Sequence, residues 1–129
     1  KCASAVLEAT KNAESVQPGA VRAKTMAFTY PDKETGEEKI VELYGIAVGD
    51  VSILGIPGEP FAETAIALKK AEGWRMILPC SLTNGFLDYF PTLDALDGSS
   101  YEARSCRFVP GIAEKIEEMG KCLLAQLKV

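Results

Sequence analysis

Residues 51–82 have the sequence VSILGIPGEPFAETAIALKKAEGWRMILPCSL, and this stretch decides the fold class. Its first part, 51–56, is short and mostly apolar, which predicts a strand covered on both faces. Apolar side chains recur at helical spacing over 60–72, which predicts a helix, and 74–82 form a second apolar run. A strand, a helix and a second strand in this order predict a βαβ unit.

Proline and glycine mark the limits of these elements. Pro60 suits the first position of the helix, where a backbone N–H would have no partner in any case. Gly73 suits the stop after the last turn. Pro79 cannot donate to a neighbouring strand, so the second half of the run 74–82 is expected at a sheet edge or a bulge.

The residues before this unit predict a helix and a hairpin. A weak apolar stripe over 3–16 predicts a helix that stops at the Gln-Pro-Gly sequence of 17–19. Residues 20–30 alternate between apolar and polar, which predicts a half-buried strand, and a charged turn at 31–38 leads to a returning strand at 39–47. The apolar positions of the first strand, with one slip in phase, are Val21, Ala23, Met26 and Phe28.

The clearest helix is the last one, over 110–127. Apolar side chains recur there at steps of three and four, so we expect the stripe to pack on the core. The alternative is that the stripe contacts a missing segment and stands exposed. Residues 86–109 are irregular, with a short helix expected at 92–97. The stripe consists of Ile112, Ile116, Met119, Leu123 and Leu127.

Together these elements predict a single α/β unit over residues 1–129: a mixed sheet with an N-terminal hairpin, a βαβ unit and a C-terminal amphipathic helix. Apolar residues make up 47% and charged residues 25%, as in ordinary globular domains. The net charge of −4 gives no electrostatic reason to expect a nucleic acid or an anionic membrane as partner. No apolar run is long enough to predict a transmembrane segment.

The chain contains no histidine, which excludes a Ser-His-Asp triad and any histidine metal ligand within it. The N-terminus has no apolar region of the kind found in signal peptides and no initiator Met, so we expect a processed end, a cleavage site or an engineered end. The cysteines lack zinc-ribbon spacing; disulfides among them stay open, but buried or idle thiols are the favoured reading. They are Cys2, Cys80, Cys106 and Cys122.

Chemically active side chains follow two consecutive strands. In open α/β sheets, sites collect beyond the carboxyl ends of the strands. Glu59 leaves the first strand at the start of the helix, where it suits a metal ligand, a catalytic base or simply a helix cap. The segment 81–92 follows the second strand and combines Asn84, Asp88 and Tyr89, although an aromatic-packed turn would also explain it.

Four short motifs then occur in one order: Gly49-Asp50, Pro57-Gly58-Glu59, Asn84 with Tyr89 and Thr92, and Tyr101-Glu102-Ala103. In this order and at these gaps they resemble the C-terminal part of the catalytic domain of the neutral/alkaline, non-lysosomal ceramidases, over roughly residues 45–112. The chain is therefore expected to be part of a larger domain. Residues 1–44 carry no motif of that family.

The resemblance implies a zinc amidase, which cleaves the N-acyl bond of ceramide to sphingosine and a fatty acid. The zinc in that family is held by two histidines, a glutamate and a tyrosine. By resemblance, Glu59 is the glutamate ligand, Tyr89 is the tyrosine ligand, and Tyr101 is a phenol that hydrogen-bonds the developing oxyanion. The resemblance also implies zinc in the complete parent domain, a lipid amide substrate and a secreted or periplasmic location, although four unpaired cysteines point the other way.

The chain also departs from the family. Both histidine ligands are missing, so an upstream segment of the parent domain or a complementing chain would have to supply them. Pro60-Phe61 replaces small hydroxyl residues and Asp88 stands where a histidine is frequent, so the substrate need not be ceramide. We expect Glu59 and Tyr89 to face one cleft, and the isolated chain to bind no stoichiometric zinc and to be inactive as an amidase.

Two other functions stay open. One is a non-catalytic structural or interaction domain that has lost the metal site. The other is a small-molecule binding domain that holds an anion at the helix N-terminus near 58–61, although no glycine-rich phosphate loop supports it.

Overall fold

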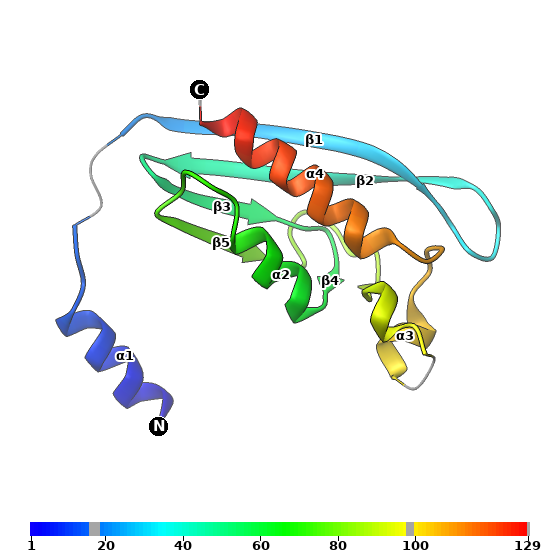
Figure 1. Cartoon of the computed structure of the whole chain (residues 1–129), viewed down its shortest axis with the longest axis horizontal. Helices are drawn as coiled ribbons and strands as arrows, with labels where there is room; N and C mark the ends of the chain where they lie inside the picture. Colours follow the sequence, from blue (N-terminus) through cyan, green and yellow to red (C-terminus); the bar gives the residue numbers. More distant parts are fainter. Residues whose placement is uncertain (16–18, 98–99, 129) are drawn as a thin grey trace.

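A computed structural model of the chain describes residues 1–15, 19–97 and 100–128. The main body is a four-stranded mixed sheet with the strand order β1-β2-β3-β5, and α2 and α4 lie on one of its faces (Figure 1). A second, two-stranded sheet, β4-β6, lies beyond the end of β3. The mixed α/β fold expected from the sequence is confirmed.

The predicted hairpin and βαβ unit are both present. β1 (Val21–Pro31) and β2 (Glu38–Val48) pair antiparallel along their whole length, and β2 continues into β3 (Val51–Gly55) through a tight turn at Gly49. β3 pairs parallel with β5 (Met76–Cys80), and α2 (Ala62–Lys69) forms the crossover. β5 is an edge strand, as Pro79 predicted.

The last helix, α4 (Ile112–Leu127), packs across β1, β2 and β3 and beside α2, in agreement with the predicted stripe. Two glycines allow this close packing. A Cβ at Gly45 would lie 2.4 Å from Leu127, and one at Gly120 would lie 2.7 Å from Leu68. The stripe is therefore a core element and does not stand exposed: Ile112, Ile116, Leu123 and Leu127 are buried, and Met119 is partly buried.

The first strand is in a single register with β2, and the predicted slip in phase is wrong. Since side chains alternate along a strand, only one of its two sets of residues can face α4. Met26 and Phe28 pack against the core, whereas Val21 and Ala23 lie on the opposite face and are exposed.

The second face of the large sheet is not covered by any helix in the described residues. β3 was expected to be covered on both faces, but its residues Ser52 and Leu54 are buried while Ile53 is 40% exposed. An apolar run predicts burial on both sides only where a second layer is present, and the described part of the chain provides one layer alone.

The helix at the N-terminus, α1 (Cys2–Lys11), is shorter than predicted and buries no residue (Figure 1). Its predicted stop at 17–19 lies largely outside the described residues. The segment that follows α1 is held to the body by an ion pair of 2.5 Å between Arg75 and Glu14. No helix in the described ranges is long and apolar enough to cross a membrane.

Short elements fill the segment between β5 and α4. They are β6 (Tyr89–Phe90), a single 3₁₀ turn at Leu93–Ala95 within the predicted short helix, and α3 (Tyr101–Ser105), which was not predicted. Ser100 caps α3, because its hydroxyl accepts a hydrogen bond of 3.1 Å from the Ala103 N–H.

Candidate functional site

Glu59 and Tyr89 are brought together by the small sheet. β4 (Glu59–Pro60) pairs parallel with β6, and Glu59 is the direct partner of Tyr89 in that pairing. Both side chains line a cavity of about 420 Å³. The expectation that they face one cleft is confirmed, and they reach it from the ends of consecutive strands of the chain.

Glycine is required for this arrangement. A Cβ at Gly58 would lie 2.5 Å from the ring of Phe90 and 2.6 Å from the carbonyl oxygen of Asp88. With no side chain there, the two strands approach closely, and the Glu59 N–H donates to the Asp88 carbonyl at 3.0 Å. Asp88 itself has a φ of 63°, so the backbone turns sharply just before Tyr89.

The position of Glu59 also decides whether this residue is simply a helix cap. Pro60 lies in β4 and not in the first turn of the helix, which begins two residues later than predicted with Phe61 as its N-cap. The N-cap position makes no side-chain capping hydrogen bond. Glu59 is therefore a residue of the small sheet whose carboxylate faces the cavity, and it does not cap α2.

Tyr101 lies next to the pair. Its ring meets that of Tyr89 edge to face, with the ring centroids 5.9 Å apart and the planes at 80°. Tyr101 is the first residue of α3 and is 63% exposed; the cavity is lined by its neighbours Ser100 and Glu102 and not by Tyr101 itself. All three residues predicted for the site are neighbours in the structure.

The cavity is rich in acidic groups. The negative charge of Glu59 raises the pKa of the Tyr89 phenol above its ordinary value, and desolvation, Tyr101, Glu102 and Asp88 raise it further. A phenolate would add a second negative charge beside the carboxylate, so the neutral phenol is favoured. Because the carboxylate residues Glu59 and Glu102 both line the cavity, the site is suited to a positively charged ligand.

The donor set fits part of a metal site. Glu59 and Tyr89 offer a carboxylate oxygen and a phenol oxygen to the same space, which are suitable ligands for zinc. Within residues 1–15, 19–97 and 100–128, however, no three His, Cys, Asp or Glu side chains are grouped so that they could hold a metal ion. Glu59 and Tyr89 are thus two oxygen donors at the lining of one cavity.

Other predicted residues lie elsewhere. Asn84 has a φ of 58°, which agrees with a role in turn geometry. It lines a separate hollow on the face of the large sheet opposite α2 and α4. Asp88 lies 3.9 Å from Arg107, which also approaches the buried carboxylate of Asp32 at 3.4 Å. We infer that Asp88 contributes to an ion-pair network beneath the site.

Sequence reasoning missed Ser100 and Glu102 as lining residues of the cavity. Glu102 was visible within the Tyr101-Glu102-Ala103 motif, but its position at the cavity depends on α3, which the sequence did not predict.

The cysteines take no part in the site. All four are free, which agrees with unpaired thiols. Only Cys106 is buried, and burial raises the pKa of its thiol. Cys2, Cys80 and Cys122 are exposed and unpaired, so of the expected buried or idle thiols Cys106 is the buried one.

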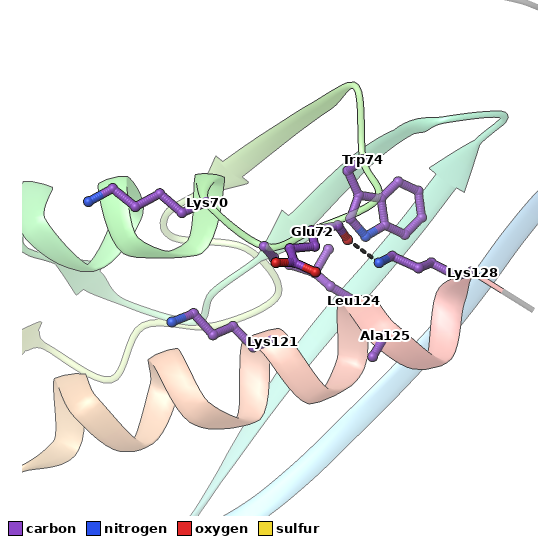
Figure 2. Close-up of a pocket in the computed structure, with 8 residues that line it drawn as sticks. Lys70, Glu72, Trp74, Lys121, Leu124, Ala125 and Lys128 are labelled. Atoms are coloured by element: carbon purple, nitrogen blue, oxygen red, sulfur yellow. Dashed lines mark hydrogen bonds between the residues drawn. The ribbon is translucent and has the colours of Figure 1, made fainter.

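A further hollow of about 280 Å³ lies between α4 and the loop that follows α2 (Figure 2). Its lysines make local contacts: Lys128 donates to the carbonyl of Glu72, and Lys121 pairs with Glu117 at 2.5 Å. The first contact holds the end of α4 against the loop after α2, whereas the second lies within α4 itself. This hollow is separate from the site at the strand ends, with which it shares no lining residue.

Comparison with known proteins gives likeness in structure alone. No protein-family model matches the sequence, and no curated protein matches it. A solved structure described as a ceramidase complexed with C2 superposes with a TM-score of 0.61 at 19% identity, covering 73% of this chain and 17% of that one. Neutral ceramidase from Pseudomonas aeruginosa gives a TM-score of 0.60 at 19% identity, covering 74% and 18%. The chain thus has the fold of part of a neutral ceramidase and spans less than a fifth of its length.

Proposed function

We propose that this chain is the part of a ceramidase-like amidohydrolase domain that carries the glutamate and tyrosine ligands of its metal. The observation that supports this most strongly is the direct pairing of Glu59 with Tyr89 at the lining of one cavity, in a fold shared with neutral ceramidases. The reaction is hydrolysis of a linear N-acyl amide, with a lipid amide as the substrate class.

Each of the three residues has a distinct part in this proposal. Glu59 and Tyr89 would hold the metal, and the phenolate that Glu59 otherwise disfavours would be offset by its positive charge. When bound, zinc would supply Lewis-acid chemistry and activate water near neutral pH. Tyr101, accessible beside Tyr89, donates a hydrogen bond to the oxyanion that forms as the amide carbon becomes tetrahedral.

The remaining ligands come from outside these residues. Since the chain has no histidine, two imidazoles are supplied by an upstream segment of the same parent domain or by a complementing chain. Glu59 and Tyr89 alone leave a zinc ion two protein ligands, one fewer than catalytic sites ordinarily have. The isolated chain therefore binds no stoichiometric zinc and hydrolyses no amide.

The test is elemental analysis after dialysis, together with hydrolysis of a fluorogenic N-acyl amide. We expect no zinc in the chain alone, and about one zinc per complex with amidase activity once the upstream polypeptide is added. Glu59→Gln and Tyr89→Phe should each abolish zinc retention in the complex, whereas the matched control Glu63→Gln should not. One tightly held zinc in the isolated chain would contradict the proposed ligand set.

A second candidate function is a non-catalytic interaction domain. It is favoured by the absence of a three-ligand group in the described residues and by the bare face of the large sheet. A complex that forms with its partner but retains no zinc and hydrolyses no amide would support this function instead.

A further inference from the structure

The open face of the large sheet is formed by three rows of side chains that run across all four strands. The pairing of the strands places these residues in line, and none of them is charged. In the order β1, β2, β3, β5, the rows are Val21, Val48, Val51 and Met76; Ala23, Ile46, Ile53 and Leu78; and Thr25, Tyr44, Gly55 and Cys80. We call these residues the open face.

The open face exposes large apolar side chains that a folded domain ordinarily covers. Ile46 is 44% exposed, Ile53 40% and Leu78 42%, and they are consecutive members of the central row. The opposite face, under α2 and α4, buries its apolar side chains. A contiguous exposed apolar patch of this kind marks an interaction surface.

The face is also hollowed. A cavity of about 590 Å³ lies on it, with Ile46 and Ile53 among its lining residues and Thr83 and Asn84 at one end. Thr83 belongs to the loop after β5, and its side chain fills the space above Gly55, where a Cβ would lie 2.6 Å away. The hollow thus gives a partner a shaped surface on which to insert an apolar side chain.

We propose that the open face is the docking surface for the part of the ceramidase-like domain that this chain does not contain, and that this part covers it with an apolar polypeptide layer of its own. This inference rests on the proposed function. The three rows contain no charged side chain, and Lys24 is the one charged residue among those that line the hollow, so the face suits an apolar polypeptide layer.

Two observations favour this occupant over a second copy of the chain. The likeness to neutral ceramidases spans 17% and 18% of their chains, so most of such a domain lies outside these residues. A second copy would also bring no histidine, since the chain has none, and would leave the metal site incomplete.

A single loop links the open face with the site that the partner must complete. The loop after β5 runs from Thr83, above the open face, to Asp88, whose carbonyl accepts from the Glu59 N–H at 3.0 Å. Within it, the Leu87 N–H donates to Pro57 at 2.7 Å, next to the small sheet. The loop after β5 therefore connects the open face with the small sheet that carries Glu59 and Tyr89.

The experiment uses the full chain and the polypeptide encoded directly upstream of residue 1, produced separately and mixed. Complex formation is measured by isothermal titration calorimetry and light scattering. Ile53→Lys and Ile46→Lys place a charge in the open face, and Ile66→Lys is the control, because Ile66 is 53% exposed on α2. Thermal melts of each variant alone confirm that it is folded.

We expect a one-to-one complex for the wild-type chain and for Ile66→Lys, and affinity lowered by roughly 30-fold or more for each open-face variant. Unchanged affinity of both open-face variants would overturn the inference, as would failure of the wild-type chain to form the complex. A wild-type homodimer that Ile53→Lys dissolves would assign the face to a second copy instead.

Zinc analysis of the same samples separates the two proposals. A complex that depends on the open face but holds no zinc supports the docking inference and contradicts the proposed function. A complex that holds zinc and hydrolyses amide equally well with Ile53→Lys overturns the docking inference and leaves the proposed function standing.

Discussion

At the scale of single residues, the pairing of Glu59 with Tyr89 couples the protonation of one to the charge of the other. The carboxylate is the largest of the causes that raise the pKa of the Tyr89 phenol. A metal ion bound between them would act in the opposite direction, because it stabilises the phenolate. The pKa of Tyr89 therefore reports directly on what the cavity contains.

Glu59→Gln is expected to lower the pKa of Tyr89 in the isolated chain towards the ordinary value for tyrosine. With the carboxylate removed, ionisation of the phenol no longer places two negative charges side by side. The measurement is an NMR titration of the ¹³Cζ resonances of the tyrosines between pH 8 and 12. Glu63→Gln, on α2, is the matched control and should leave the titration unchanged; an equal shift in both variants would contradict the assignment.

Gly58→Ala is expected to open the small sheet and to destabilise the chain by about 1–3 kcal/mol. The added Cβ meets the carbonyl of Asp88 and the ring of Phe90, both of which are held in place by the core and the strand pairing. Urea unfolding measures the loss of stability, and the Tyr89 titration should show a smaller pKa shift as Glu59 moves away.

Gly85→Ala is the control for that substitution. Its Cβ would meet only Pro57, at 3.4 Å, which is close to ordinary contact distance. If Gly85→Ala cost as much stability as Gly58→Ala, the close approach at β4 and β6 would not be what requires glycine at position 58.

At the scale of elements, α4 is the principal layer over the sheet. Ile116 is fully buried at its centre, and Ile116→Ala is expected to lower the free energy of unfolding by about 2–5 kcal/mol. Urea unfolding followed by circular dichroism checks this value. Ile66→Ala, on the exposed side of α2, should change stability by less than about 0.5 kcal/mol; similar losses in both variants would contradict the assigned packing.

Long periodic elements could be predicted from the sequence, and short ones could not. The spacing of apolar residues in α4 and the alternation in β2 carry information over several turns or residue pairs. β4 and β6 have two residues each, which is too short for any period, and they exist because Gly58 lets their backbones approach. That Glu59 and Tyr89 face one cleft was expected from strand order and from family resemblance, but the small sheet that pairs them was not.

The alternation of apolar residues in β1 shows a second limit of prediction from the sequence. Val21 and Ala23 are apolar and so are Met26 and Phe28, although the two pairs lie on opposite faces. Apolar residues on both faces can mean a slip in phase or a second apolar surface, and the sequence does not distinguish them. The structure shows a second apolar surface: Val21 and Ala23 belong to the open face, whereas Met26 and Phe28 pack against the core.

At the scale of the whole molecule, α1 is separate from the packed body. It buries none of its residues, and the chain is fastened to the body only from Glu14 and Ser15 onward, through Arg75. A chain that begins at residue 12 is therefore expected to unfold with a free energy within about 0.5 kcal/mol of the full chain, as measured by urea unfolding. A larger loss would mean that α1 covers part of the body in solution.

The sequence separation between α4 and the hairpin that it covers has a consequence for biosynthesis. The β1–β2 hairpin leaves the ribosome before α4, the helix that covers its inner face. At about 5–20 residues per second, synthesis of the intervening ~80 residues takes roughly 4–16 s. Throughout that interval Met26, Phe28 and Leu43 have no helix to pack against, so the nascent hairpin presents apolar surface on both of its faces. Such a nascent chain is a suitable client for a ribosome-associated chaperone, and its release has to await the final turn of α4.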